Sequence, residues 1–156
     1  MKIHVLTREQ LLTGSPGEVF PLFADARNLE RITPPFLRFR VLTPGAPAMR
    51  AGAELDHRLR LHGLPLRWRT RIEVWDPPCR FVDRQLAGPF RLWHHTHDFA
   101  PDGDATRMRD VVRYALPLGP AGAAAHAAFV RRDLARIFDF RRVAVEQLVE
   151  RSGAAA

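Results

Sequence analysis

Residues 81–116 constrain the fold most, because they read as two extended segments joined by a turn, with side chains alternating between two faces. One face of the first segment carries Trp93, His95, His97 and Phe99. Beyond the turn at residues 100–104, the same face carries Met108, Asp110, Val112, Tyr114 and Leu116. The large apolar side chains predict that this face points inward. Ionisable groups in a core need partners, so His95, His97 and Asp110 predict a cavity lined partly by polar groups.

The length of 156 residues fits one domain. We expect a single ligand-binding domain over residues 1–150 and a disordered tail over residues 151–156. Residues 1–12 alternate polar and apolar side chains and lack a continuous apolar stretch. We therefore expect no secretion signal and no stable membrane insertion, and a cytoplasmic location. One cysteine, Cys79, excludes an internal disulfide.

The formal charge of +7 comes almost entirely from arginine, with Lys2 as the only lysine. Such an excess raises the question of nucleic acid or of an anionic membrane surface as a partner. The arginines are scattered through strand-like and helical segments and form no basic tail, and no nucleic-acid-reading motif occurs. We therefore expect no nucleic-acid partner, and attraction to a membrane surface is a minor alternative.

The remaining pattern predicts an α+β fold. Ser15, Pro16 and Glu18 indicate a helix start after a strand over residues 2–12. That helix spans residues 16–24, and a second short one spans 26–32. Strands follow over residues 37–42, 53–61, 66–74 and 81–86, which with the hairpin makes six or seven antiparallel strands. The outer face of residues 66–75 carries Trp75 and arginines, with Glu54 and Glu73 as expected partners, and Val74 faces inward. A long amphipathic helix occupies residues 120–150.

The run from Phe81 to Phe99, with Gly88-Pro89-Phe90 followed by Trp93-x-His95-x-His97-x-Phe99, is similar to bacterial ligand-binding members of the SRPBCC superfamily, which includes START-like and polyketide cyclase/dehydrase proteins. Thr106-x-Met108-x-Asp110-x-Val112-x-Tyr114 continues the likeness, which covers essentially the whole chain. The resemblance implies a helix-grip fold, in which a curved antiparallel sheet of six to seven strands wraps around one long C-terminal helix, with two short helices after the first strand. It also implies a cavity for a largely apolar small molecule, but no single activity.

We predict a site from the inward positions of the strands and one helix position. The candidate ligand-binding residues are His57, Trp68, Phe81, Asp83, Gln85, Trp93, His95, His97, Phe99, Met108, Asp110, Tyr114 and Phe138. An apolar wall with a few polar groups is typical of a small-molecule site. The same pattern fits a core with one satisfied network, in which Asp83 or Asp110 accepts from a histidine nitrogen.

Three functional hypotheses remain open. The first is a carrier, sensor or presenter that binds a small hydrophobic or amphipathic molecule in the cavity. The second is a polyketide-type cyclase or dehydratase, with His95 or His97 as general base, Asp110 or Asp83 orienting it, and Tyr114 donating to an enolate oxygen. The third is an accessory domain that binds a protein partner. Two imidazoles and a carboxylate could hold zinc, but an interior lined with tryptophan and phenylalanine gives no independent support for it. We therefore expect no metal and no cofactor. The oligomeric state stays open.

Overall fold

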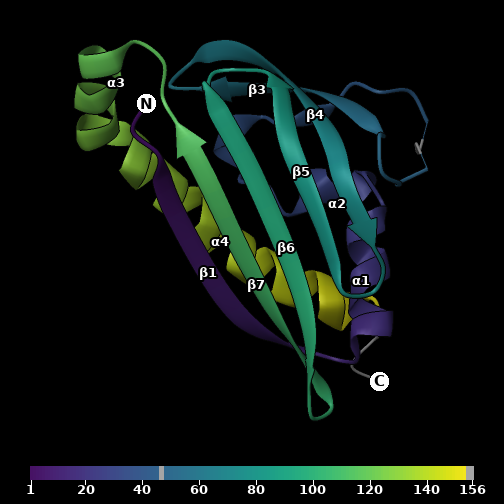
Figure 1. The fold of residues 1–156 in the computed structure, drawn as a ribbon. Helices are drawn as coiled ribbons and strands as arrows, with labels where there is room; N and C mark the ends of the chain where they lie inside the picture. The colour runs from purple at the N-terminus through teal and green to yellow at the C-terminus, as the bar shows by residue number, and fades with distance from the viewer. Residues whose placement is uncertain (46–47, 154–156) are drawn as a thin grey trace.

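The structure is a computed structural model, which describes residues 1–45 and 48–153 of the chain (Figure 1). Seven strands form one sheet in which every neighbouring pair is antiparallel. They are β1 (His4–Thr13), β2 (Arg40–Val41), β3 (Glu54–Leu61), β4 (Leu64–Asp76), β5 (Arg80–Ala87), β6 (Leu92–Asp102) and β7 (Ala105–Ala115). Their order in space is β1-β7-β6-β5-β4-β3-β2. The predicted six to seven antiparallel strands are confirmed.

The first helices lie between β1 and β2, where the sequence predicts them. They are α1 (Pro16–Ala24), α2 (Arg27–Arg31) and the 3₁₀ turn η1 (Pro35–Leu37). The start of α1 is held by Glu18, whose carboxylate accepts from the Ser15 backbone N–H at 2.8 Å and from the Ser15 hydroxyl at 3.1 Å. This is the arrangement that Ser15 and Glu18 predict. Part of the turn-rich stretch before β3, residues 46–47, lies outside the described residues.

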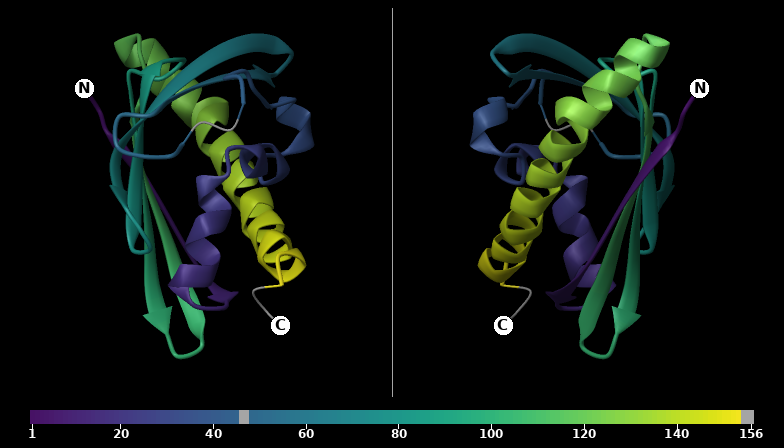
Figure 2. Two further views of the ribbon diagram at one scale, coloured as in Figure 1. Left: turned by 90° about the vertical axis from the view of Figure 1, so that its right-hand side faces the viewer. Right: turned by 90° about the vertical axis from the view of Figure 1, so that its left-hand side faces the viewer.

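The long C-terminal helix runs diagonally across one face of the sheet (Figure 2). It consists of α3 (Gly119–Ala125), one π-helical turn η2 (His126–Val130) and α4 (Arg131–Arg151). The π turn is not predicted from the sequence. Of the predicted tail, Arg151 is still helical and residues 154–156 lie outside the described residues. In the part of the chain that the structure describes, no helix combines the length and apolar character needed to cross a membrane.

The inward face of the β6–β7 hairpin is the one predicted by alternation. Every second side chain of β6 from Trp93 to Phe99 is buried, as is every second side chain of β7 from Thr106 to Tyr114. His97 lies opposite Asp110 and Trp93 lies opposite Tyr114 in the strand register. Near the lower half of the sheet the core joins α1 to α4 through Phe20, Phe23, Phe81, Phe99 and Val145.

Alternation gives the wrong face for two residues near the end of β4. Val74 is predicted to point inward and Trp75 outward. In the structure Val74 is 41% exposed, whereas the Trp75 ring packs 5.0 Å from Phe20 and 5.6 Å from Phe81. The cause is a shift of register between β4 and β5 after Ile72. Such a bulge adds a residue to one strand and reverses the alternation beyond it.

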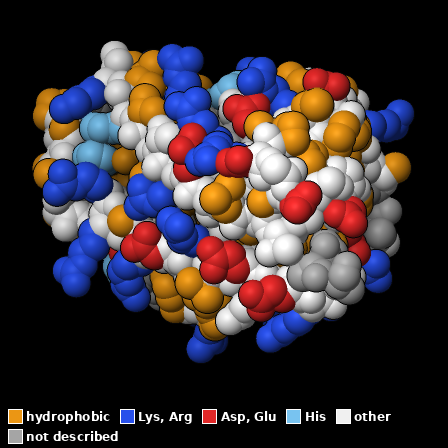
Figure 3. Space-filling model, turned by 90° about the horizontal axis from the view of Figure 1, so that it is seen from below, with side chains coloured by type: hydrophobic (Ala, Val, Ile, Leu, Met, Phe, Trp, Pro, Cys, Tyr) orange, Lys and Arg blue, Asp and Glu red, His pale blue; other side chains and the backbone are white. Residues whose placement is uncertain are grey.

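The outer face of the sheet pairs its arginines with acidic neighbours. Arg71 lies 2.6 Å from Glu54, and Arg84 lies 3.1 Å from Glu73. Both predicted carboxylate partners are therefore used. On the face seen in Figure 3, basic and acidic side chains also lie intermixed, with apolar side chains between them.

Candidate functional site

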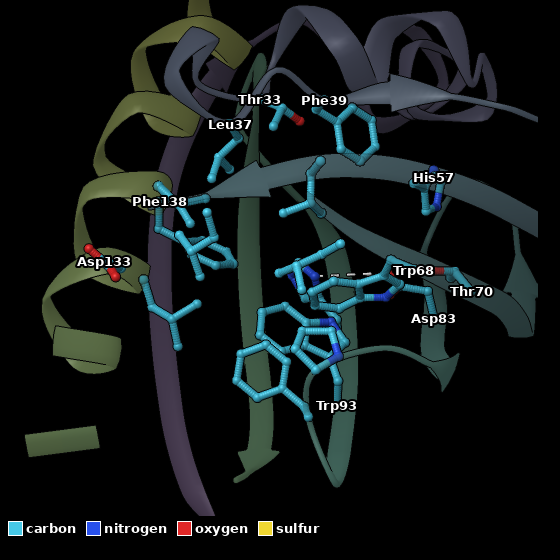
Figure 4. Close-up of a pocket in the computed structure, with 18 of the residues that line it drawn as sticks. Thr33, Leu37, Phe39, His57, Trp68, Thr70, Asp83, Trp93, Asp133 and Phe138 are labelled. Carbon is cyan, nitrogen blue, oxygen red and sulfur yellow. Dashed lines mark ion pairs between the residues drawn. The ribbon is translucent and has the colours of Figure 1, made fainter. Parts of the chain in front are cut away.

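A cavity of about 460 Å³ lies between the sheet and the long helix, and its wall is mostly apolar. Its aromatic part is built around Trp68 on β4 and Trp93 on β6, whose rings meet edge to face at 5.1 Å (Figure 4). Phe90, from the loop before β6, packs 4.9 Å from Trp93. Helix α4 contributes Leu134, Ile137 and Phe138. A pocket of this size and composition is in the range that binds small organic molecules.

Eight of the thirteen predicted ligand-binding residues line this cavity. They are His57, Trp68, Phe81, Asp83, Trp93, His95, His97 and Phe138. The other five are absent from its wall: Gln85, Phe99, Met108, Asp110 and Tyr114. These placements are geometric, and the functional role of each residue stays a prediction.

Gln85 fixes the loop that carries Phe90. Its side-chain NH₂ donates to the Phe90 carbonyl at 2.7 Å, and its side-chain oxygen accepts from the Phe90 N–H at 3.2 Å. Gly88 leaves room for this contact, because a Cβ there would lie 2.5 Å from the Gln85 side-chain oxygen. Gln85 does not line the cavity, but it fixes the position of Phe90, which does.

Tyr114 packs against the wall residues Trp93 and Phe90 but does not itself line the cavity. Its hydroxyl is 2.9 Å from Nε2 of His126, whose ring stacks on that of His4 at 3.6 Å. The hydroxyl that the cyclase hypothesis assigns to an enolate oxygen is thus engaged outside the cavity.

Two histidines and two aspartates form a buried polar cluster on β5, β6 and β7. His95 Nε2 lies 2.8 Å from Asp110 Oδ1, and His97 Nε2 lies 2.8 Å from Asp83 Oδ2. His97 Nδ1 lies 2.9 Å from the same Asp110 Oδ1, but without hydrogen-bond geometry. Arg141 reaches the cluster from α4, with Nε 3.9 Å from Asp110 Oδ2. The predicted Asp–His contacts are present, and both aspartates take part.

The cluster shifts the pKa values of its two histidines in opposite directions. Burial lowers the pKa of His95, and the charge of His97 lowers it further. Burial also opposes the charged form of His97, but its contacts with Asp110 and Asp83 outweigh burial and raise its pKa. The pKa of Asp110 is held well below its ordinary value, because Arg141 and the histidines overcome the effect of burial. At neutral pH the carboxylates are therefore ionised, and His97 is the histidine that holds a proton most strongly.

A third histidine of the wall, His57, lies on β3. It is 5% exposed, and its Nδ1 has no hydrogen-bond partner. Burial lowers its pKa to about 4, although the charges of Asp83 and Asp56 oppose that shift. His57 is therefore neutral at pH 7, and its ring forms part of the cavity wall (Figure 4).

Two polar residues of the long helix belong to the cavity wall and are missing from the predicted set. Asp133 accepts from His62 Nε2 at 2.7 Å and so links the β3–β4 turn to α4. Arg141 supports the polar cluster. A signal for both exists in the sequence, since each lies four residues from Ile137 on the apolar stripe of the helix. Polar residues on such a stripe face the interior.

The mouth of the cavity lies near the start of the long helix. Leu118 and Phe129 line the cavity and yet are 78% and 44% exposed. Side chains with one side on the cavity and the other on solvent mark the boundary between the two. His62 reaches this region and contacts the Phe129 ring edge to face at 5.8 Å.

Comparisons with known proteins agree with this architecture. A family model described as polyketide cyclase / dehydrase and lipid transport matches residues 4–151. A crystal structure of TTHA0849 from Thermus thermophilus superposes with a TM-score of 0.74 at 21% identity, covering 96% of this chain and 99% of that one. Protein CV1439 from Chromobacterium violaceum gives 0.73 at 16% identity, covering 94% and 96%. No curated protein matches the sequence.

Some of the similar structures contain small molecules. Norcoclaurine synthase from Thalictrum flavum, in complex with dopamine and hydroxybenzaldehyde, superposes with a TM-score of 0.67 at 15% identity, covering 96% of this chain and 88% of that one. At these identities the likeness to solved structures shows a shared fold. It does not by itself assign an activity.

Proposed function

Because the chain belongs to the polyketide cyclase/dehydrase and lipid transport family of the SRPBCC superfamily, we propose that it binds a small hydrophobic or amphipathic molecule in the cavity. It would act as a carrier, sensor or presenter of that molecule. The observation that carries the proposal is the wall itself, a space of about 460 Å³ between sheet and helix with aromatic and aliphatic sides. We propose further that residues 1–150 act as one ligand-binding domain in the cytoplasm.

The polar groups of the wall indicate what the ligand carries besides its apolar body. His57 is a neutral imidazole in the cavity wall, so a hydroxyl or carbonyl group of the ligand would suit it better than a charged group. The best ligand is therefore largely apolar, with one or two uncharged polar groups.

A neutral fluorescent probe tests this proposal. N-phenyl-1-naphthylamine suits the measurement, because a neutral molecule is not drawn to the surface arginines and its emission rises in apolar surroundings. Ala125 lines the cavity, whereas the adjacent Ala124 is exposed on the same helix. We expect saturable binding of one probe per chain. Ala125→Phe should weaken it at least tenfold, and the matched control Ala124→Phe should leave it within twofold. Equal affinity in both variants would contradict binding in the cavity.

A second candidate function is a cyclase or dehydratase of the polyketide type. It is favoured by the opposite pKa shifts of His95 and His97, which place a proton acceptor beside a proton donor at the cavity wall. Neighbouring groups with separated pKa values suit acid–base chemistry on a carbonyl substrate. The test is product formation from a short poly-β-keto thioester, followed by mass spectrometry. Turnover that His97→Ala and Asp110→Asn both leave unchanged would remove these residues from the reaction.

A further inference from the structure

The front of the buried polar cluster gathers three atoms that ligate metals. They come from Asp83, His95 and His97, each of which offers one ligand atom within 4.8 Å of the others. From this arrangement we infer that Asp83, His95 and His97 form a binding site for one divalent transition-metal ion. Two imidazoles and one carboxylate are the donor set of many zinc and non-haem iron sites.

The distances between these atoms suit an ion with little rearrangement. Asp83 Oδ2 lies 2.8 Å from His97 Nε2 and 3.8 Å from His95 Nδ1. A tetrahedral ion with bonds of about 2.0–2.1 Å needs its ligand atoms about 3.3 Å apart. The two distances fall on either side of that value, so a movement of about 0.5 Å brings both to it.

Asp110 supplies the support that metal-binding histidines use. The other ring nitrogens, Nε2 of His95 and Nδ1 of His97, lie 2.8 and 2.9 Å from Asp110 Oδ1. Each ring therefore directs one nitrogen toward Asp83 and the other toward Asp110. A ligating histidine usually donates its second N–H to a carboxylate, which fixes its tautomer. His97 Nδ1 has no hydrogen-bond partner without the ion, and coordination at Nε2 would make it the protonated nitrogen beside Asp110.

The charge of the cluster also calls for a cation at this place. With both imidazoles neutral, two carboxylates and one guanidinium leave a net charge of −1. A divalent ion would change that charge to +1, and a hydroxide or other anionic group bound to the ion would then balance it. Ring packing restricts the orientation of both imidazoles, since the centre of the His97 ring lies 3.9 Å from that of Phe81 and 3.7 Å from that of His95.

The three ligands face the cavity, whereas Asp110 does not line it. An ion held by three protein ligands would keep its remaining positions open on the cavity side, as catalytic zinc sites do. A hydroxyl or carbonyl oxygen of a molecule in the cavity could complete the coordination. This inference goes beyond binding of an apolar molecule, and metal uptake is measured without any organic ligand.

The test is titration of the untagged, chelator-treated chain with Co²⁺, followed by competition with Zn²⁺. We expect one ion per chain. Asp83→Asn should weaken binding at least a hundredfold, because it removes a ligand while keeping the side-chain shape. Asp110→Asn should weaken it about 10- to 100-fold, the usual effect of losing a supporting carboxylate. His57→Gln changes another buried histidine of the same wall and is the matched control, with an affinity within twofold of the wild type.

Nitrogen NMR of the histidine-labelled wild type tests the site without relying on a variant that folds. On addition of Zn²⁺ we expect the resonances of His95 Nδ1 and His97 Nε2 to report coordination. Absence of stoichiometric binding would overturn the inference. The inference would also be overturned if Asp83→Asn bound Zn²⁺ with unchanged affinity and the NMR signals of coordination came from the stacked pair His4 and His126. Either result leaves the binding of an apolar probe as a separate question.

Discussion

Replacing His57 with leucine should remove a large part of the acid sensitivity of the fold. His57 is 5% exposed beside the ring of Phe39, and burial lowers its pKa from 6.5 to about 4. The unfolded chain therefore takes up a proton at this side chain at a higher pH than the native state does. Stability falls as the pH drops below about 6.5, and this loss stops near pH 4.

The size of the effect follows from the two pKa values. Between about pH 7.5 and about pH 5, a group with pKa 6.5 unfolded and about 4 folded costs about 2 kcal/mol of unfolding free energy. Urea denaturation followed by tryptophan fluorescence, at both pH values, measures it. His57→Leu should lose about 2 kcal/mol less than the wild type over this interval. The control Thr96→Leu, which changes a non-titrating side chain of β6, should keep the wild-type profile. A His57→Leu variant with the same acid sensitivity as the wild type would refute the reasoning.

Two further predictions concern stability at neutral pH. Asp110→Ala should lower the free energy of unfolding, measured by urea denaturation, by about 3–5 kcal/mol, because it leaves Arg141 buried without its counter-charge. The control Asp98→Ala on the outer face should lower it by at most about 1 kcal/mol. Similar losses in the two variants would show that the cluster is solvated. Trp75→Ala should lower the free energy of unfolding, measured by thermal denaturation, by about 3 kcal/mol, and Val74→Ala should lower it by less than about 1 kcal/mol. A larger loss in Val74→Ala than in Trp75→Ala would mean that β4 has no bulge.

The sequence predicts much of this fold because alternation is unbroken where the site is built. In β6 and β7 a short turn joins two regular strands, so counting by two from Trp93 reaches each buried residue up to Phe99. The same count fails at Val74 and Trp75, since a bulge depends on pairing with β5 and leaves no mark in the residues themselves.

The distances within the site are beyond what alternation provides. It places Asp83, His95 and His97 on one face, but their convergence depends on the register in which Asp83 pairs with His95 across β5 and β6. The contribution of the helix is also set by its diagonal path over the sheet. That path brings Arg141 to Asp110 of the polar cluster and Asp133 to the β3–β4 turn.

The most direct test of the proposed binding function is native mass spectrometry of the protein purified from its own cells, before and after extraction with organic solvent. Retention of one small, largely apolar molecule per chain is the predicted result, with its loss on extraction and a gain of capacity for N-phenyl-1-naphthylamine. A chain that carries nothing and that takes up no probe in saturable fashion would contradict the account, because a preformed apolar cavity of about 460 Å³ should accept one.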